Sequence, residues 1–508
     1  MTALRPSHPH PAPLTELVAG LGLSGDTDSE TLIHDITLDS RDAVPGSLWV
    51  ALPGRGAHGA SYAGPALRCG VSAILTDRDG AAVLGDVGVP VCISDVLRKD
   101  MGEVAARVFG HPAGKMLTMG VTGTNGKTTT VALLEAALAS AGRRIGTIGT
   151  IGFRLDGENL PSARSTVTTP ESPDLQALLA VMAERGADTV ALEVSSHAMV
   201  LERVTGTVLD VSGFLNLGMD HMDFHGDQEN YFEAKAGLFT PEHTRAAVCW
   251  VDDEHGARIA ERARRAGLRV VTVGSSDDVD VQLIDWQPVK PLGGRASIRL
   301  HGRPVALEIA LPGRHNMIDA TLALAMAECV GVPVDDALVG LRSAQVPGRM
   351  QLLELTSDAP SVIIDFAHTP QAVAASLDAL AQSFEHVITV LGCGGDRDRE
   401  KRPRMGLAAA ERSDLLVVTD DNPRTEDPAT IRRAMLSGIT SARGEVVEVA
   451  GRRRAIEHAL TVATADSVVA ILGKGHEHGQ QIGHDVIDFD DGVEARRAWF
   501  TITEGRPR

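Results

Sequence analysis

Short runs of valine, isoleucine, leucine and alanine recur along the chain and alternate with stretches that have the apolar spacing of helices. Each run is apolar at consecutive positions, which is typical of strands buried on both faces of a parallel sheet. The runs cover residues 116–121, 189–194, 211–217, 246–251 and 270–273 in the middle of the chain, and 362–364, 387–391, 415–419, 446–449 and 468–472 towards its end. The alternation predicts an α/β fold with mostly parallel sheets.

The pattern changes at two places along the chain. The first 110 residues have shorter apolar runs, at 48–52 and 71–75, between turns rich in glycine and proline. Segments 110–114 and 345–349 have the composition of linkers, and the second follows a helical pattern over 320–341. A chain of 508 residues is too long for one hydrophobic core. We therefore expect three domains, which are residues 1–113, 114–345 and 346–508.

Composition narrows the class of protein. The net charge of −19 argues against a nucleic acid or an anionic membrane as partner. We also expect a monomer that acts on small-molecule substrates. The five cysteines are scattered without a C-x-x-C pair, which favours a reducing compartment. No apolar run approaches the roughly 18 residues of a membrane span. These features predict a soluble cytoplasmic protein whose proline-rich start, residues 1–13, is a frayed tail.

The strongest local motif is Gly-Val-Thr-Gly-Thr-Asn-Gly-Lys-Thr-Thr-Thr at residues 120–130. It follows an apolar run and opens a helical pattern that stops at Gly142. Backbone N–H groups and the helix dipole would face an anion there, Lys127 would neutralise it, and the Thr128 hydroxyl can hold Mg²⁺. The usual P-loop spacing places a glycine at position 121, where this chain has Val121. We therefore predict an ATP site built on a P-loop variant.

Carboxylates and histidines follow the next strands of the same block. Glu193 ends the apolar run 189–194, where a P-loop fold needs an acid to hold Mg²⁺ against the phosphates. His221 and His225 are four residues apart and would share one face of a helix, as zinc ligands do. However, no H-E-x-x-H motif or nearby cysteine supports zinc. A hard-cation site that uses His221 and carboxylates is the better prediction.

The last block carries polar motifs just beyond its apolar runs. Asp365 ends one run, and the segments 394–402, 420–424 and 473–479 follow others. Open parallel sheets bind ligands at these strand ends, so Arg397 and Arg424 could clamp a carboxylate there. The sequence Gly-Cys-Gly-Gly-Asp-Arg at 392–397 lacks the third glycine of a dinucleotide fingerprint, which argues against NAD binding.

Together these motifs resemble the Mur ligase family of peptidoglycan synthesis over nearly the whole chain. The segments that resemble its ATP and Mg²⁺ elements are 122–129, 193–197, 220–223 with Lys235, 311–316 and 365–370. Other segments resemble the members that add a diamino acid, and these are 38–41, 394–398, 421–424 and 473–477. The resemblance implies an ATP-dependent ligase with a small α/β uridine-binding domain, a central P-loop-type domain and a C-terminal Rossmann-like domain.

The resemblance also implies roles for individual residues. ATP would be bound by Gly123, Thr124, Asn125, Gly126, Lys127, Thr128, Thr129, Asn316, Arg349 and Asp365. The nucleotide-linked dipeptide UDP-MurNAc-L-Ala-D-Glu would be bound by Leu38, Ser40, Arg55, Gly56, Ala57, Thr168, Thr169, Ser195 and Arg203. The metal ligands would be Thr128, Glu193, His221 and Lys235, the last as a carbamate. Lys127, Glu193, His221 and Lys235 would be the catalytic residues.

The incoming amino acid would be meso-diaminopimelate, bound by Arg397, Asp421, Asn422, Pro423, Arg424, Gly473 and Glu477. Diaminopimelate has a second ammonium–carboxylate end that lysine lacks, and Arg424 can pair with the extra carboxylate. The alternatives are the same ligase acting on lysine or another diamino acid, a folylpolyglutamate synthase, and a P-loop ATPase that switches partners. The uridine-binding motif at 38–41 argues against the second, and three successive substrate-sized sites argue against the third. The chain departs from the family's pattern at His58, Val167, Leu201, Phe366, Gln371 and His478.

Overall fold

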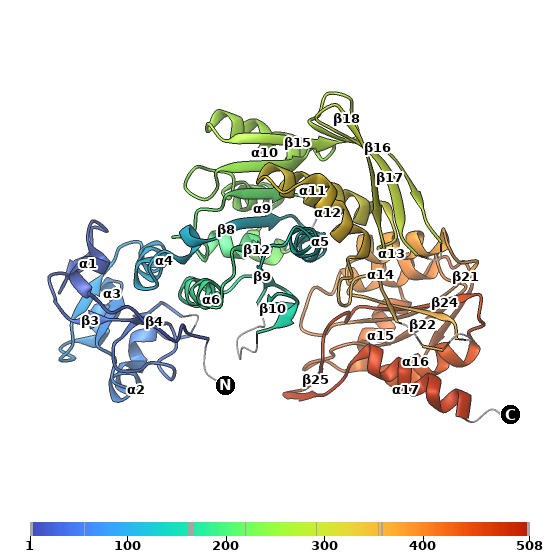
Figure 1. The fold of residues 1–508 in the computed structure, drawn as a ribbon. Helices are drawn as coiled ribbons and strands as arrows, with labels where there is room; N and C mark the ends of the chain where they lie inside the picture. Colours follow the sequence, from blue (N-terminus) through green and yellow to red (C-terminus); the bar gives the residue numbers. More distant parts are fainter. Residues whose placement is uncertain are drawn as a thin grey trace. The chain divides into compact units, whose positions relative to one another are not determined.

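The computed structural model describes residues 4–54, 56–160, 167–218, 220–290, 292–353, 355–356 and 359–504. These residues fall into two compact units. The first unit comprises Met1–Gln282, Leu300–Gly302 and Leu322–Gly340, and the second comprises Leu283–Arg299, Arg303–Thr321 and Leu341–Arg508. Sheets and helices alternate through both units, as Figure 1 shows, so the predicted α/β fold is confirmed. In the described part of the chain, no helix is long and apolar enough to cross a bilayer.

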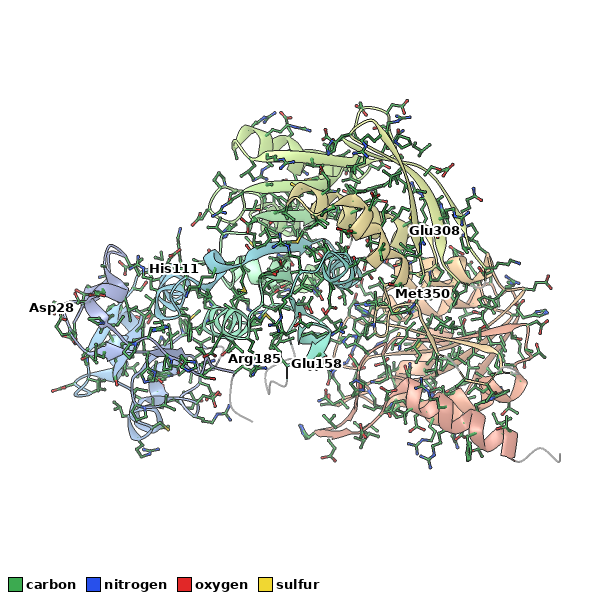
Figure 2. All side chains as sticks on the ribbon, in the orientation of Figure 1. Asp28, His111, Glu158, Arg185, Glu308 and Met350 are labelled. Atoms are coloured by element: carbon green, nitrogen blue, oxygen red, sulfur yellow. The ribbon has the colours of Figure 1, made fainter. Side chains whose placement is uncertain are left out.

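The N-terminal sheet of the first unit has the strand order β2-β7-β6-β5-β4. Its strands are β2 (Ser24–Gly25), β7 (Val91–Ile93), β6 (Ala73–Thr76), β5 (Ser47–Ala51) and β4 (Asp35–Thr37). β4 to β7 are parallel, and β2 pairs antiparallel with β7. Leu48 and Val50 of β5 are buried against helix α4 (Leu97–Val108), and the apolar runs 48–52 and 71–75 correspond to β5 and β6. The segment around His111, where φ is +49°, leads from α4 to the next sheet (Figure 2).

The start of the chain is anchored rather than frayed. Arg5 Nε donates to Asp35 Oδ1 (2.5 Å), and Arg5 Nη1 donates to Asp174 Oδ1 (3.2 Å) in helix α6 (Ser172–Glu184). Strand β1 (Ala12–Pro13) pairs antiparallel with β3 (Leu32–Ile33). The predicted frayed tail is therefore wrong for residues 4–13, because charged partners distant in the sequence hold it.

The central sheet of the first unit contains the parallel order β9-β12-β8-β13-β14-β15. Its strands are β8 (Leu117–Thr122), β9 (Ile145–Gly149), β12 (Thr189–Glu193), β13 (Val211–Phe214), β14 (Ala246–Trp250) and β15 (Arg269–Gly274). β10 (Gly152–Leu155) and β11 (Glu158–Asn159) extend one edge antiparallel. The five runs predicted in this block are all strands. β9 escaped prediction because glycines interrupt its apolar pattern.

The segment after β15 departs most from the sequence prediction. Strands β16 (Val281–Pro288), β17 (Gly294–Leu300) and β18 (Arg303–Ile309) follow β15 in the sheet order, and many of their positions are exposed. The helical pattern predicted over 320–341 is two helices, α11 (Arg314–Cys329) and α12 (Val334–Ser343). The two helices are separated by Gly331 and Pro333. Gly331 has a φ of +84°, which ends a helix, and Pro333 lacks the backbone N–H that would continue it.

The C-terminal sheet of the second unit has the order β19-β20-β24-β21-β22-β23 and is parallel except for β19 (Gln351–Leu353). The parallel strands are β20 (Ser361–Asp365), β21 (His386–Cys393), β22 (Leu415–Asp420), β23 (Glu445–Glu448) and β24 (Ser467–Leu472). They confirm the runs predicted in this block. Alternate residues face opposite sides, so that Val468 and Ala470 join one apolar cluster, and Val469 and Ile471 join the other.

Helices cover both faces of this sheet, as in a Rossmann-like domain. Apolar residues of α13 (Pro370–Ala381), α14 (Lys401–Ala410) and α15 (Pro428–Leu436) pack on one face. Those of α16 (Arg452–Val462) and α17 (Asp491–Glu504) pack on the other. The hairpin β25 (Gln480–Ile482) and β26 (Asp485–Ile487) follows β24. The carboxyl ends of β21, β22 and β24 therefore lie at one edge of the sheet.

Candidate active site

The P-loop connects β8 to helix α5 (Lys127–Ser140). Gly126 is the N-cap residue with φ of +90°, and a Cβ atom on Gly123 would lie 2.9 Å from Leu215 Cβ. Lys127 Nζ donates to Gly123 O (2.8 Å) and Thr124 O (3.1 Å), so the ammonium folds back over the loop. The loop thus has the predicted strand–turn–helix context of a phosphate site.

Val121 explains why the motif departs from the usual spacing. The residue is buried and still belongs to β8, where it pairs with Glu193 on one side and Gly213 on the other. The turn therefore begins two residues later, at Gly123. A glycine at 121 is unnecessary because the position lies within the sheet.

Glu193 and Thr128 meet below the loop. Glu193 is 1% exposed at the end of β12, and its Oε1 accepts a hydrogen bond of 2.9 Å from Thr128 Oγ1. Thr150 donates to the same carboxylate from its backbone N (2.8 Å) and its Oγ1 (3.0 Å). A Cβ atom on Gly149 would lie 2.3 Å from Glu193 Oε1, so the close approach requires glycine. A buried carboxylate beside a hydroxyl, at a phosphate loop, is a set of hard oxygen donors that fits Mg²⁺.

Lys235 is buried under the same loop. It lies on helix α9 (Gln228–Ala236), is 1% exposed, and its Nζ donates to Gly123 O (2.9 Å). The ammonium also stands 4.5 Å from the centre of the Tyr231 ring. Burial, together with the nearby Lys127 charge, lowers the pKa of Lys235 well below its usual value. The lowered pKa favours the neutral amine, which is the form that reacts with carbon dioxide.

His221 and His225 do not lie within one helix as predicted. His221 has φ of +56° and only caps the short helix α8 (Met222–His225), although both rings lie against His197, with ring centres 4.7 and 5.6 Å apart. The His221 side chain is 47% exposed and its Nε2 lies 3.4 Å from Asp220 Oδ2, whereas buried His225 contacts Ser196 Oγ (2.9 Å). Within the described residues, no three His, Cys, Asp or Glu side chains form a metal-binding group. Of the predicted ligands, the structure joins Thr128 to Glu193.

The residues predicted to hold the dipeptide gather at the end of β12. Thr169 Oγ1 donates to Glu193 O (2.8 Å) and accepts from Ser195 N (3.1 Å). Thr168 Oγ1 lies 3.2 Å from Thr150 Oγ1, and Arg203 Nη1 donates to Thr169 O (3.1 Å). The structure therefore brings these four predicted residues into one cluster.

Glu171 belongs to this cluster but was not predicted from the sequence. Its carboxylate pairs with Arg203 (2.8 Å) and with Arg98 of α4 (2.9 Å), so it links the N-terminal and central sheets of the first unit. The position lies in a Thr-Thr-Pro-Glu-Ser-Pro turn, which by itself carries no signal for an ion pair.

The residues predicted to hold uridine lie in two loops of the N-terminal sheet. Leu38 and Ser40 are half-buried after β4, and Gly56 and Ala57 are exposed after β5. Arg55 lies outside the described residues. One family departure has a structural role, because His58 Nδ1 accepts from Ala60 N (3.0 Å) and caps the short 3₁₀ helix Gly59–Tyr62.

The remaining residues predicted for ATP lie in the second unit. Asn316 on α11 is buried and donates from Nδ2 to Pro312 O (2.6 Å). Asp365 at the end of β20 accepts from Met350 N (3.3 Å) and from the Ser376 hydroxyl.

Two further features of this region concern Arg349. Its guanidinium stands 4.5 Å from the centre of the Phe366 ring, so the departure to phenylalanine provides a stacking surface. Asp319, which was not predicted, is buried nearby, and burial raises its pKa well above the usual value although the Arg349 charge opposes this. The raised pKa favours the protonated form of Asp319, which can donate a hydrogen bond.

The residues predicted for the amino acid lie at the ends of β22 and β24. Asp421 and Asn422 are buried directly after β22, and a Cβ atom on Gly473 would lie 2.8 Å from Asp421 Oδ2. Arg424 has φ of +51°, and its Nη1 donates to Gly395 O (2.7 Å). The predicted residues from the two strand ends are thus joined.

Two other predicted positions face outward. Arg397 is exposed, and no hydrogen bond or ion pair joins it to another described residue. His478, one of the departures from the family's pattern, is 77% exposed and pairs with Asp490 (2.8 Å).

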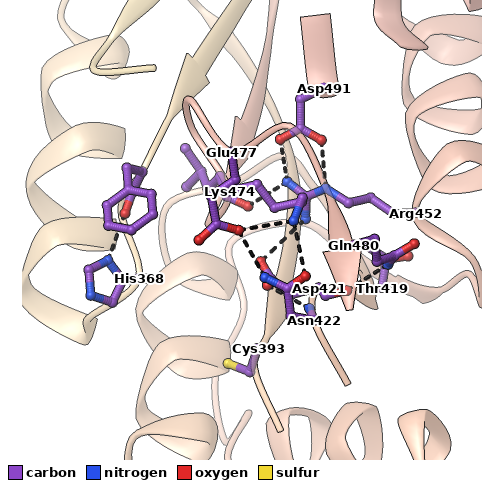
Figure 3. A network of polar contacts seen from close by, with 12 residues as sticks. His368, Cys393, Thr419, Asp421, Asn422, Arg452, Lys474, Glu477, Gln480 and Asp491 are labelled. Carbon is purple, nitrogen blue, oxygen red and sulfur yellow. Dashed lines mark hydrogen bonds and ion pairs between the residues drawn. The ribbon is translucent and has the colours of Figure 1, made fainter. Parts of the chain in front are cut away.

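Figure 3 shows a polar network around Asp421 and Asn422 that sequence reasoning missed. Lys474 is fully buried, and its Nζ donates to Asn422 Oδ1 (3.2 Å), Glu477 Oε2 (3.0 Å) and Gly479 O (2.5 Å). Behind it, Arg452 forms a buried two-point pair with Asp491 (2.7 Å for both bonds). Of these residues, only Lys474 could have been found from the sequence, because it stands between two glycines in the segment 473–479.

Comparison with known proteins places this arrangement in a family. Residues 121–327 match the Mur ligase middle domain, and residues 348–475 match the Mur ligase glutamate ligase domain. The UDP-N-acetylmuramoyl-L-alanyl-D-glutamate–2,6-diaminopimelate ligase of Streptomyces avermitilis is 41% identical over 97% of each chain. The chain belongs to the Mur ligase family.

Solved structures agree with this assignment. A structure of a UDP-N-acetylmuramoyl-L-alanyl-D-glutamate–2,6-diaminopimelate ligase is 30% identical, with a TM-score of 0.69 over 97% of this chain and 99% of that chain. The folylpolyglutamate synthase of Mycobacterium tuberculosis, solved with ADP and AMPPCP, shares the fold at 21% identity. Its TM-score is 0.61, and the match covers 79% of this chain and 94% of that chain.

Proposed function

We propose that the protein is an ATP-dependent ligase that joins meso-2,6-diaminopimelate to the D-glutamyl residue of UDP-N-acetylmuramoyl-L-alanyl-D-glutamate. The observation that carries the proposal is the contact of Thr128 with buried Glu193 beneath the phosphate loop. In the same chain, Asp421, Asn422 and Gly473, which are predicted for a diamino acid, lie together at the ends of β22 and β24. The named ligase relatives, at 41% and 30% identity over nearly the full length, support the same reaction.

The proposed chemistry has two steps. An oxygen of the D-glutamyl γ-carboxylate attacks the γ-phosphorus of ATP, the bond to the β-phosphate oxygen breaks, and ADP leaves. The resulting acyl phosphate is attacked by the α-amine of diaminopimelate. The amide bond forms, phosphate leaves, and the amine loses one proton. Positioning and charge stabilisation account for most catalysis in the phosphoryl step.

We assign Lys127 to the phosphoryl step. Its ammonium now donates to two loop carbonyls, Gly123 O and Thr124 O, and phosphate oxygens would be stronger acceptors from the same position. Thr128 and Glu193 would hold Mg²⁺, and this ion, when bound, would neutralise charge on the transferring phosphoryl group. We assign Asn316, Arg349 and Asp365 to the same nucleotide.

Lys235 is proposed to act as a carbamate. A buried neutral amine can add carbon dioxide and release a proton, which gives an anion with two oxygens next to Gly123. Such an anion adds hard oxygen ligands where the described side chains offer few.

The diamino acid is assigned from the chemistry of the C-terminal pocket. Arg424 can pair with the second carboxylate of diaminopimelate, and Glu477 can accept from its second ammonium. Lysine lacks that carboxylate, so Arg424 would have no substrate group to pair with in a lysine-specific ligase. A folylpolyglutamate synthase is disfavoured because its match leaves about a fifth of this chain uncovered, whereas the relatives named as diaminopimelate ligases cover nearly all of it.

Phosphate release tests the proposal. The purified full chain is incubated with ATP, Mg²⁺, the nucleotide-linked dipeptide and, separately, meso-diaminopimelate, L-lysine and L-ornithine. We expect phosphate release only when both the dipeptide and meso-diaminopimelate are present, with a tripeptide product identified by mass. Tripeptide formation with lysine instead would reassign the amino acid, and no product with any diamine would overturn the function.

The setting of the reaction is also proposed. All five cysteines are free in the structure, which suits a reducing cytoplasm. We expect the protein to work as a monomer on small-molecule substrates, without nucleic acid or a membrane. Sedimentation of the purified chain at several concentrations tests whether the protein is a monomer.

A further inference from the structure

Lys474 carries a buried charge that none of the proposed steps uses. The residue follows β24, and its side chain is 0% exposed. An ammonium has three N–H donors. They are met by Asn422 Oδ1, Glu477 Oε2 and Gly479 O, at 3.2, 3.0 and 2.5 Å. With every donor used and no exposed surface, Lys474 cannot itself bind a substrate.

The partners of Lys474 are residues proposed to hold the diamino acid. Asn422 Nδ2 donates to Glu477 Oε2 (2.8 Å), so the cation, the carboxamide and the carboxylate form a closed triangle (Figure 3). Glu477 Oε1 makes no hydrogen bond to any described residue, and the side chain is 37% exposed. The triangle fixes one oxygen of Glu477 and leaves the other available.

Lys474 also fixes the backbone of the segment that follows it. Its bond to Gly479 O closes the loop that carries Glu477, and Asn422 Oδ1 accepts from Gln481 N (2.9 Å) in the following hairpin. An apolar side chain in place of Lys474 would leave Gly479 O without this donor and Glu477 Oε2 with Asn422 Nδ2 alone, which is costly. The loop and Glu477 would then be free to move.

We propose that Lys474 is a positioning residue for the diamino acid, and that it acts by holding Glu477 and Asn422 through its hydrogen bonds to them. The inference rests on the proposed function, because Glu477 and Asn422 are assigned to the diamino acid there. It is specific to the amino-acid step, since the hydrogen bonds of the Lys474 side chain go to Asn422, Glu477 and Gly479 and not to the residues assigned to ATP or the dipeptide.

The test compares kinetic constants of full-length wild type and Lys474→Met with varied meso-diaminopimelate, ATP and dipeptide. We expect the KM for meso-diaminopimelate to rise about 10- to 100-fold, as for the loss of hydrogen bonds to a charged group. The KM values for ATP and for the dipeptide should stay within about twofold, and kcat should change much less than the KM for the amino acid. A role in folding alone would lower the active fraction without this selective shift.

A double-mutant cycle tests whether Lys474 acts through Glu477. If Lys474 acts through Glu477, Lys474→Met in a Glu477→Gln background should raise the KM by a far smaller factor than in wild type. Arg453→Met is the matched control, because it removes a two-point ion pair with Glu494 (2.6 and 2.7 Å) that does not touch this triangle. It should leave the KM for meso-diaminopimelate unchanged.

Different results would overturn the positioning role of Lys474 and the proposed function of the protein. An unchanged KM in folded Lys474→Met, or fully additive effects in the cycle, would overturn the positioning role while wild type still forms product. Lys474→Gln is the second variant, and we expect a smaller shift in the same constant. Failure of both variants to fold would assign Lys474 to the structure alone and overturn the inference. Wild type that forms no tripeptide would instead overturn the proposed function.

Discussion

Thr128 Oγ1 donates a 2.9 Å hydrogen bond to Glu193 Oε1, which joins the first turn of α5 to the end of β12. Neighbouring parallel strands bring the two together, because β12 pairs with β8, the strand that precedes the phosphate loop. A hydroxyl and a buried carboxylate thus meet without any other element being needed.

The Thr128–Glu193 contact predicts a large kinetic effect for its removal. Glu193→Gln keeps the shape but loses the charge that would hold the metal ion. We expect the rate of ADP formation to fall on the order of 10²–10³-fold, as when one group that stabilises transition-state charge is removed. Thr128→Ser keeps the hydroxyl and serves as the control with near wild-type rates. Equal rates for Glu193→Gln and wild type would refute the assignment.

Lys235 should respond to dissolved carbon dioxide and to pH. With ¹³C-labelled bicarbonate, we expect a carbamate NMR signal in wild type that is missing in Lys235→Ala. Activity of Lys235→Ala should fall about 10- to 100-fold and recover in part when short carboxylates are added. Full activity of this variant without such additions would remove the carbamate from the mechanism.

The lowered pKa of Lys235 also fixes the sign of a stability effect. Between the lowered folded-state pKa and the usual value of about 10.4, the unfolded chain binds more protons than the folded chain. The free energy of unfolding attributable to this group should therefore rise with pH across that window. Urea unfolding in carbonate-free buffer, with Lys235→Met as reference, measures the difference. A contribution that falls as pH rises would contradict the burial argument.

Arg424 should determine the choice of amino acid. Its loss leaves the second carboxylate of diaminopimelate without a partner, which costs on the order of 2–4 kcal/mol, or ~30–1000-fold. We expect Arg424→Ala to raise the KM for meso-diaminopimelate by such a factor and to leave the KM for ATP nearly unchanged. If the two constants move together, Arg424 does not recognise the amino acid.

Arg452 and Asp491 should contribute to stability as a pair. Both side chains are 0% exposed, so Arg452→Met leaves an unpaired buried carboxylate and should lower the free energy of unfolding by about 3–5 kcal/mol. Replacing both, as in Arg452→Met with Asp491→Leu, should recover much of the loss because neither member of the pair is left as an unpaired buried charge. Urea unfolding followed by circular dichroism measures both variants. A double variant less stable than the single one would contradict this account.

The parallel strands could be predicted from the sequence because burial on both faces makes them apolar throughout. β16 to β18 could not, since many of their positions are exposed and mimic polar loops. The single helical pattern over 320–341 was misleading because Ala, Leu and Val continue across the break at Gly331.

In the candidate site too, features that depend on neighbouring residues could be predicted, whereas contacts between residues distant in the sequence could not. The phosphate loop depends on neighbouring residues, so Lys127 and Thr128 were predicted correctly as part of one strand–turn–helix unit. Glu171 and Lys474 were missed because their partners lie far away in the sequence, as Arg98 and Asn422 do. His221 and His225 were misjudged because a left-handed residue at 221 prevents a continuous helix.

Arg5 has a practical bearing on how the protein is handled. Its guanidinium reaches both Asp35 of the N-terminal sheet and Asp174 of α6, so the first described residues form a strap that joins these two elements of the first unit. A purification tag fused directly to that end, or a clone shortened to begin near residue 10, would remove or crowd the strap. Tags are better attached after α17, at the opposite terminus.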